Sequence, residues 1–138
     1  MSIRASTAHI VAVHDAVRPL VTVDDIEATI AAADKTGAAI LTTRVTDTIK
    51  KIEDNSVVET LDRELLRRAV TPQCFKYEIL RRAFAEADTS ESLFTDESTL
   101  VERMGCPIGF VDGSPLNIKI TTPHDLLIAE AYLAALDG

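Results

Sequence analysis

The sequence predicts an α/β fold in which a mainly parallel sheet is flanked by helices. Short apolar runs without polar alternation, at 9–13 and 38–43, are typical of strands buried in a parallel sheet. Segments with helical spacing of apolar residues occur between such runs, so strands and helices alternate along the chain. The chain has 138 residues, of which 46% are hydrophobic. This length and composition fit one folded domain over 1–138.

The first elements are predicted to be a strand, a helix and a strand. After the strand at 9–13, Thr22 is a suitable helix N-cap, and Asp25 follows it at the capping-box spacing. Gly37 then ends the helix and the second strand begins directly after it. This order predicts a βαβ unit with a right-handed crossover.

Residues 45–62 are predicted to form a β-hairpin. Two short β-like runs flank the turn-forming sequence EDNS at 53–56. A hairpin with few apolar residues and many charges packs poorly on the core of its own domain. We expect a projecting arm that contacts a second copy of the chain, with a plain surface hairpin as the alternative.

The second half of the chain continues the alternation of extended and helical segments. The elements expected there are an extended piece at 71–75, an amphipathic helix at 76–87, a helix at 96–105 with Thr95 as N-cap, a strand and turn at 107–114, an alternating strand at 115–121, and a C-terminal helix from Thr122 and Pro123. In the alternating strand, Asn117 and Lys119 are expected to face away from the apolar side.

Composition argues against several classes of protein. A net charge of −8 and a pI near 4.8 argue against a nucleic-acid-binding surface. No apolar run approaches the roughly 18 residues of a membrane span, and the N-terminal residues show no apolar signal-peptide core. Cys74 and Cys106 lack metal-ligand spacing, so reduced thiols in a cytoplasmic protein are expected.

Three residues near predicted strand ends have side chains suited to phosphate chemistry. Asp15 is either a Mg²⁺ ligand or the cap of a turn. Arg18 is either a phosphate ligand or half of a surface ion pair. Lys119 either neutralises charge on a transferring phosphoryl group or is a lysine on an exposed strand. Because ligands bind at the carboxyl ends of strands in such sheets, the position favours a site without deciding its chemistry.

Four further polar residues have an ordinary structural interpretation when considered singly. Thr48 suits a strand, Arg63 suits the solvated start of a helix, and Thr71 and Thr95 are suited to backbone capping. Motifs of several other enzyme classes are absent from the sequence, including GxSxG, HExxH and GxxxxGK[ST].

Five segments, taken in order, resemble one known family. They are VHDAVRP at 13–19, TDTIK at 46–50, TLDRELLRRAVTPQCF at 60–75, TDESTLVE at 95–102 and NIKITTPHDLLIAE at 117–130. Over nearly the whole chain, the sequence is similar to the 2-C-methyl-D-erythritol 4-phosphate cytidylyltransferases of the non-mevalonate pathway of isoprenoid biosynthesis.

The resemblance implies a Rossmann-like sheet and a reaction of CTP with methylerythritol phosphate that releases pyrophosphate, assisted by Mg²⁺ or another divalent cation. By position, Asp15 matches the residue that binds the metal and CTP, and Lys119 matches a catalytic lysine that also binds the nucleotide. The family's substrate-binding residues correspond to Arg18, Thr48, Arg63, Thr71 and Thr95. The family's arm reaches across a homodimer, in agreement with the hairpin predicted at 45–62.

One departure from the family pattern is important. Family members begin with a strand and a glycine-rich loop that wraps CTP, whereas this sequence has no glycine before Gly37. We therefore expect a partial nucleotidyltransferase domain that does not turn over CTP alone and whose sheet exposes an apolar edge. The alternatives are a non-catalytic binding or assembly fragment, and a sibling cytidylyltransferase that acts on ribitol 5-phosphate.

Overall fold

The computed structural model describes residues 8–87 and 96–136. The elements are, in chain order, β1 (Ile10–Val13), α1 (Val23–Thr36), β2 (Ala38–Arg44), β3 (Ile49–Glu53), β4 (Ser56–Leu61), the 3₁₀ turn η1 (Arg63–Leu65), β5 (Arg67–Lys76), α2 (Tyr77–Glu86), α3 (Glu97–Arg103), β6 (Gly109–Asp112) and α4 (Pro123–Leu136). The α/β class predicted from the sequence is confirmed.

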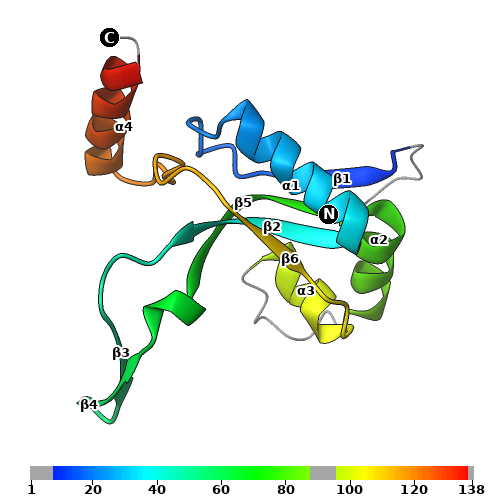
Figure 1. Cartoon of the computed structure of the whole chain (residues 1–138), viewed down its shortest axis with the longest axis horizontal. Helices are drawn as coiled ribbons and strands as arrows, with labels where there is room; N and C mark the ends of the chain where they lie inside the picture. Colours follow the sequence, from blue (N-terminus) through cyan, green and yellow to red (C-terminus); the bar gives the residue numbers. More distant parts are fainter. Residues whose placement is uncertain (1–7, 88–95, 137–138) are drawn as a thin grey trace.

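The main sheet has four strands in the order β1-β5-β2-β6 (Figure 1). β5 runs antiparallel to both of its neighbours, whereas β2 and β6 are parallel. Three of the four strands therefore run in one direction, as a mainly parallel sheet requires, with β5 inserted between β1 and β2. The expected βαβ unit is modified in the same way, because its two strands are not adjacent. β1 lies at an edge of the sheet with an apolar sequence, IVAV.

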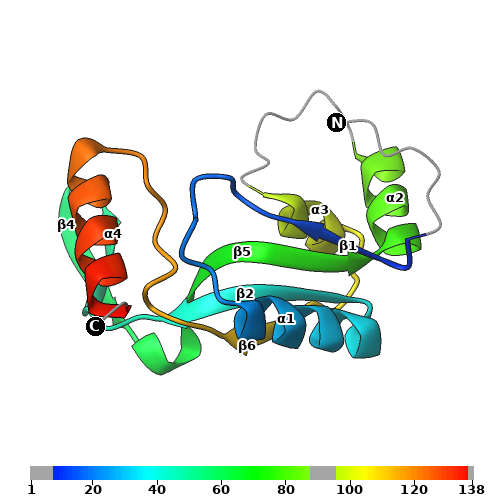
Figure 2. The same cartoon turned by 90° about the horizontal axis from the view of Figure 1, so that it is seen from above.

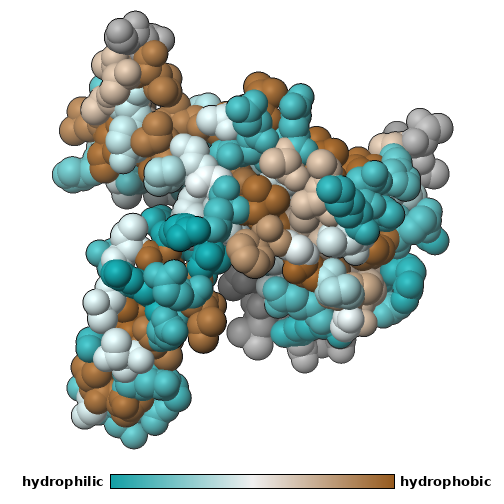
Figure 3. All heavy atoms as spheres, viewed as in Figure 1, coloured by the Kyte–Doolittle hydropathy of each residue, from teal (hydrophilic) through white to brown (hydrophobic). Residues whose placement is uncertain are grey.

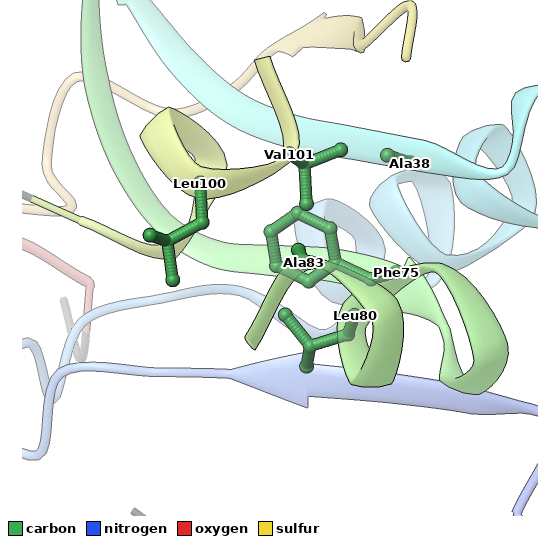
Figure 4. Close-up of a cluster of buried hydrophobic side chains, with 6 residues drawn as sticks. All are labelled: Ala38, Phe75, Leu80, Ala83, Leu100 and Val101. Atoms are coloured by element: carbon green, nitrogen blue, oxygen red, sulfur yellow. The ribbon is translucent and has the colours of Figure 1, made fainter. Parts of the chain in front are cut away.

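Helices cover both faces of the sheet (Figure 2). Successive residues of a strand point to opposite faces, and β2 and β5 use this alternation. Ala38 and Phe75 face α2 and α3, in a cluster completed by Leu80, Ala83, Leu100 and Val101 (Figure 4). Ala39 and Cys74 face α1 and pack against Ala33.

Helix α1 begins and ends as the sequence predicts. The Asp25 backbone N–H donates to Thr22 Oγ1 at 3.1 Å. At the other end, Gly37 has a φ of 95°, in the left-handed region that favours glycine. A Cβ at this position would lie 2.6 Å from Ile79 Cδ1, so the end of this side chain would have to shift to admit one.

Strands β3 and β4 form a separate two-stranded hairpin that extends from the sheet (Figure 1). Together with the segments that connect it to β2 and β5, η1 included, it makes up residues 45–66, here called the arm. Asp54 and Asn55 at its tip have φ values of 46° and 65°. Positive φ at both central residues is the backbone of a type I′ turn, which Asp and Asn tolerate better than other non-glycine residues. The predicted hairpin is confirmed.

Three expectations about local structure are wrong or lie outside the described residues. Segment 115–121 alternates apolar and polar residues but forms a loop, because its backbone pairs with a turn, through Ile120 N–H to Val17 O at 2.8 Å, rather than with a strand. Arg63 starts a 3₁₀ turn rather than an α-helix, because β5 begins only four residues later. Asp96, not Thr95, caps α3, through Thr99 N–H to Asp96 Oδ1 at 3.0 Å, and Thr95 lies outside the described residues.

Helix α4 extends from the same end of the sheet as the arm (Figure 1). Its apolar residues are largely exposed, and Figure 3 shows hydrophobic surface over this helix. Ala129 is its only buried residue in the part of the chain that the structure describes. Across 8–87 and 96–136, no helix has the length and apolar character needed to cross a membrane.

Candidate active site

The candidate site begins directly after β1, at the carboxyl end of this strand. Residues 15–18 form a tight turn that is closed by the hydrogen bond from Arg18 N–H to Asp15 O at 3.0 Å. The loop 113–122 crosses this turn and is attached to it by the Ile120 N–H bond to Val17 O. Two segments that are far apart in the sequence therefore bring their polar side chains to one place.

Asp15, Arg18 and Lys119 form an ion cluster. The Asp15 Oδ2 atom lies 3.0 Å from Arg18 Nε and 3.3 Å from Lys119 Nζ. Arg18 is the most buried of the three, with 12% of its side chain exposed, compared with 32% for Asp15 and 48% for Lys119. Burial acts to raise the pKa of Asp15, but the hydrogen bonds and charges of Arg18 and Lys119 outweigh it and leave this pKa below its ordinary value.

A network of hydrogen bonds to neutral groups holds the cluster in place. The Asp15 backbone N–H donates to Thr71 Oγ1 at 3.0 Å, and a 2.8 Å hydrogen bond joins this hydroxyl to His14 Nδ1. The Asn117 side-chain amide donates to Thr71 O at 2.9 Å, and Arg18 Nη1 donates to Asn117 O at 2.9 Å. Strand β5, the 15–18 turn and the 113–122 loop are thereby tied together at Thr71 and Asn117.

Beside the cluster is a pocket of about 230 Å³. It is lined by Val13, Asp15, Arg18, Ala69, Val70, Thr71, Gln73, Asp96, Glu97 and Lys119. On its α3 side, Gln73 Nε2 donates to Asp96 Oδ2 at 2.9 Å, and Ser98 N–H donates to Gln73 Oε1 at 3.0 Å. Burial acts to raise the pKa of Asp96, but hydrogen bonds from Gln73, Ser98 and Thr99 outweigh it and lower this pKa. The pocket is therefore lined by two cationic side chains, Arg18 and Lys119, and by three carboxylates, Asp15, Asp96 and Glu97, which suits it to a polar ligand.

The donor set at the pocket fits a divalent cation that arrives with a phosphate ligand. Within the described ranges, no group of three or more His, Cys, Asp or Glu residues is placed to hold a metal. Mg²⁺ is commonly bound through one or two carboxylates together with substrate phosphates. In the described part of the chain, Arg18 and Lys119 both contact Oδ2 of Asp15, so Oδ1 is the oxygen that remains for such a cation.

Of the residues singled out in the sequence, the structure brings four together at this pocket: Asp15, Arg18, Thr71 and Lys119. Thr48 and Arg63 lie instead at the base of the arm, where Arg63 Nη1 donates to Thr46 O at 2.7 Å. Thr95 lies outside the described residues, although Asp96 and Glu97 next to it line the pocket.

Comparison with known proteins decides the family. The sequence model of IspD, 2-C-methyl-D-erythritol 4-phosphate cytidylyltransferase, matches residues 1–135. The chain belongs to this cytidylyltransferase family. A 2-C-methyl-D-erythritol 4-phosphate cytidylyltransferase of Bacillus cereus is 48% identical over 128 residues, and one of Acidobacterium capsulatum is 46% identical over 136 residues.

Solved structures of the cytidylyltransferase family share the fold. The Thermus thermophilus 2-C-methyl-D-erythritol 4-phosphate cytidylyltransferase has a TM-score of 0.82 and 34% identity, covering 94% of this chain and 64% of that one. The 4-diphosphocytidyl-2C-methyl-D-erythritol synthase of Anaerococcus prevotii has a TM-score of 0.87 and 34% identity, covering 95% and 59%. The matches to the two curated relatives cover 93% and 96% of this chain but only 57% of each relative. The chain thus spans little more than half the length of those cytidylyltransferases.

Sequence reasoning missed three residues that shape the site: Gln73, Asp96 and Asn117. A signal existed for Gln73, because a polar residue among apolar neighbours in TPQCF indicates a buried polar group, and Gln73 is 2% exposed. Asn117 was expected to face outward with Lys119, but it is buried while Lys119 is exposed. The regular alternation was misleading there because the loop is not a pleated strand.

Proposed function

We propose that this chain provides part of a cytidylyltransferase site that joins CTP to 2-C-methyl-D-erythritol 4-phosphate in isoprenoid precursor biosynthesis in the cytoplasm. The observation that carries the proposal is the Asp15–Arg18–Lys119 cluster at the pocket, in a chain of this family. The relatives are named for this activity.

The reaction is an in-line substitution at phosphorus. An oxygen of the methylerythritol phosphate group attacks the α-phosphorus of CTP and forms a new P–O bond. The bond from that phosphorus to the bridging oxygen breaks, and pyrophosphate leaves with the electron pair. Negative charge increases on the oxygens of the α-phosphate and on the leaving group, so cations fixed in advance at this point lower the barrier.

The cluster offers two such cations with different properties. Arg18 is held by Asp15 and by the Asn117 carbonyl, so its guanidinium is fixed in orientation. Among the described residues, the Lys119 ammonium contacts only Asp15, and nearly half of the Lys119 side chain is exposed. An ammonium on a flexible stem can shift from Asp15 to an incoming phosphate, which suits Lys119 to the transition state and Arg18 to binding.

A divalent cation fits the same scheme. Asp15 is the residue that would hold it, through Oδ1, together with phosphate oxygens of the nucleotide. When bound, Mg²⁺ supplies further positive charge to the phosphates during the transfer. The lowered pKa of Asp15 keeps this carboxylate ionised at neutral pH, as a metal ligand requires.

The arm supplies the remaining part of the proposal. Thr48 and Arg63 at its base do not line the Asp15 pocket. We propose that they bind methylerythritol phosphate at the pocket of a second copy, in a homodimer formed through the arm. In support, the arm exposes Ile52, Val57 and Val58, of which 55%, 62% and 47% remain accessible. Apolar side chains on a two-stranded ribbon are stabilised when another surface covers them.

The test of activity compares this chain with the chain joined to the part of the Bacillus cereus relative that the match does not cover. From the family pattern, we expect this to be the relative's N-terminal part. We expect the joined protein to release pyrophosphate from CTP only when methylerythritol phosphate is present, and this chain alone to release none. Ribitol 5-phosphate as substrate separates the sibling activity. Absence of transfer in a folded joined protein would contradict the proposed function.

The test of the dimer is sedimentation of this chain across a range of concentrations. We expect a dimer that is weakened by Val57→Asp, because this change places a charge in the proposed interface. Glu59→Gln, on the same strand, is the control. A monomer at all concentrations would contradict the proposed arm contact.

A further inference from the structure

The root of the arm contains two arginines that face each other across the sheet. Arg44 is the last residue of β2, where the chain leaves for the arm, and Arg67 is the first residue of β5, where it returns. The two are directly opposite in the antiparallel register. Like charges in such a pair destabilise a sheet unless another group compensates them.

Asp112, at the end of β6, is the compensating group. Its carboxylate lies 2.7 Å from Arg67 Nε, through Oδ1, and 3.4 Å from Arg44 Nε, through Oδ2. Arg67 Nη2 also approaches Oδ2, at 3.4 Å. Thr42 Oγ1 lies 3.1 Å from Oδ1 and completes the surroundings of the carboxylate. The hydrogen bond from Arg67 is the largest cause of a lowered pKa for Asp112, so this group remains ionised well below neutral pH.

Arg67 extends this connection from the core sheet to the arm. Its Nη1 atom donates to Glu64 O at 3.1 Å and to Leu66 O at 2.8 Å, in and just after η1. Its guanidinium carbon lies 5.4 Å from the centre of the Phe110 ring, also on β6. With 22% of its side chain exposed, Arg67 is far more enclosed than Arg44, at 70%.

Among the described residues, the arm makes few other contacts that could fix its direction. β3 and β4 form a sheet of two strands, and a two-stranded ribbon is only marginally stable by itself. Arg63 closes the base of the arm by donating to Thr46 O, but this bond joins two parts of the arm to each other. The contacts of Asp112 and Arg67 join the arm to β6, which belongs to the main sheet.

We propose that Asp112 is a positioning residue that fixes the direction of the arm relative to the main sheet, and thereby the placement of Thr48 and Arg63. The effect on Thr48 and Arg63 rests on the proposed function, whereas the effect on the direction of the arm does not. The Asp112 carboxylate binds both Arg44, where the chain leaves the sheet for the arm, and Arg67, where it returns. Asp112 and Arg44 lie outside the five segments that resemble the family, and Arg67 lies in one of them without an assigned role, because only the sheet brings the three residues together.

The primary test measures the direction of the arm. Spin labels are placed next to the arm tip, by Ser56→Cys, and on the exposed side of α1, by Glu27→Cys, with Cys106→Ser and with unlabelled chain added in excess. Pulsed dipolar spectroscopy gives the distribution of distances between the labels. We expect Asp112→Asn to broaden this distribution, because both arginines lose their common charge partner. Glu53→Gln is the matched control, since it breaks an ion pair with Lys51 within the arm and leaves the root intact.

A second variant keeps the test decisive if Asp112→Asn does not fold. Arg67→Lys retains the charge but cannot make the paired bonds to Asp112 and both carbonyl bonds together. We expect it to broaden the distribution as well. A distribution in either folded variant that is as narrow as that of the parent chain would overturn the proposal.

The kinetic consequence is measured in the protein joined to the relative's N-terminal part. Asp112→Asn should raise KM for methylerythritol phosphate by roughly tenfold or more, since misplacement of binding groups by about 1 Å is costly, while KM for CTP changes little. A broadened distribution with an unchanged KM for methylerythritol phosphate would retain the role of Asp112 in the arm and contradict the roles proposed for Thr48 and Arg63. A merely general loss of stability would change both KM values or neither.

Discussion

Lys119 and Asp15 are far apart in the sequence, yet the Lys119 ammonium lies 3.3 Å from the Asp15 carboxylate. Asp15 follows a strand at the edge of the sheet, and Lys119 lies on a loop that makes a backbone hydrogen bond to the Asp15–Arg18 turn. The contact therefore depends on the conformation of this loop, which is not itself a strand of the sheet. It places a half-exposed ammonium next to the carboxylate that we propose as the ligand of the metal and the nucleotide.

The Lys119→Met variant tests this contact. Removal of the ammonium eliminates a hydrogen bond and a charge that lower the pKa of Asp15, so that pKa should rise. NMR titration of the Asp15 carboxyl carbon in this chain measures the change. In the protein joined to the relative's N-terminal part, the transfer rate should fall by about 10² to 10³.

Lys35→Met is the control for this change. Lys35 lies in the last turn of α1, on a helix that does not line the pocket. It should leave the Asp15 titration and the transfer rate unchanged. Equal effects of the two variants would show that the Lys119 contact has no special role.

The Thr71 hydroxyl is expected to contribute to stability as well as to the site. It accepts the Asp15 N–H and is bonded to His14, so Thr71→Val leaves both without their partner. Loss of this hydroxyl should lower the free energy of unfolding by roughly 1 to 2 kcal/mol, measured with urea. Thr71→Ser retains the hydroxyl and should lose clearly less. If the two variants are equally unstable, the methyl group rather than the hydrogen bonds is responsible.

Local sequence signals predicted the parts of the fold that depend on local interactions. The cap of α1 at Thr22, its end at Gly37 and the turn of the arm at Asp54 and Asn55 are all formed by neighbouring residues. For the same reason, capping side chains and turn residues can be recognised without knowledge of the rest of the chain.

Strand β5 shows why the remaining parts were harder to predict. It begins with two arginines and contains Pro72, yet it occupies an interior position of the sheet. Pairing with β1 and β2 and burial of Gln73, Cys74 and Phe75 stabilise it, and these interactions are not local. In the site, the motifs indicated Asp15, Arg18, Thr71 and Lys119, whereas Asn117 required knowledge of the loop conformation.

The core between the sheet and α2 provides a test of packing. Leu80 is fully buried beside Phe75, in the cluster that also contains Val101 (Figure 4). Leu80→Ala should lower the free energy of unfolding by about 3 kcal/mol or more, because the lost contacts leave a cavity. Leu65→Ala, at a side chain that is 83% exposed, should change it by less than about 0.5 kcal/mol. Urea unfolding of both variants compares them, and similar losses would contradict the described core.

The start of α4 is expected to depend on acid pH through Asp125. This carboxylate accepts the N–H groups of Thr121 and Thr122 at 2.9 and 2.8 Å, and the Asp125 N–H donates to Thr122 Oγ1 at 3.3 Å. The backbone hydrogen bond from Thr121 is the largest of the contributions that lower the pKa of Asp125 to about 2, from 3.8. A depressed pKa in the folded state means that the ionised carboxylate stabilises the fold at pH values above 3.8. This contribution is lost as the pH falls through about 2.

The measurement follows the Thr121 and Thr122 amide resonances by NMR from about pH 6 downward, a range that begins well above the ordinary pKa of a carboxyl group. Their shifts should change together with a midpoint near the pKa of about 2 given for Asp125. In Asp125→Asn this change of the amide shifts should be absent. The free energy of unfolding of this variant should be lower than that of the parent chain above pH 3.8, and the two values should approach each other near pH 2. Glu130→Gln removes a charge from the middle of the same helix and should retain the transition. A midpoint near 3.8 in the parent chain would show that the carboxylate does not accept these hydrogen bonds in solution.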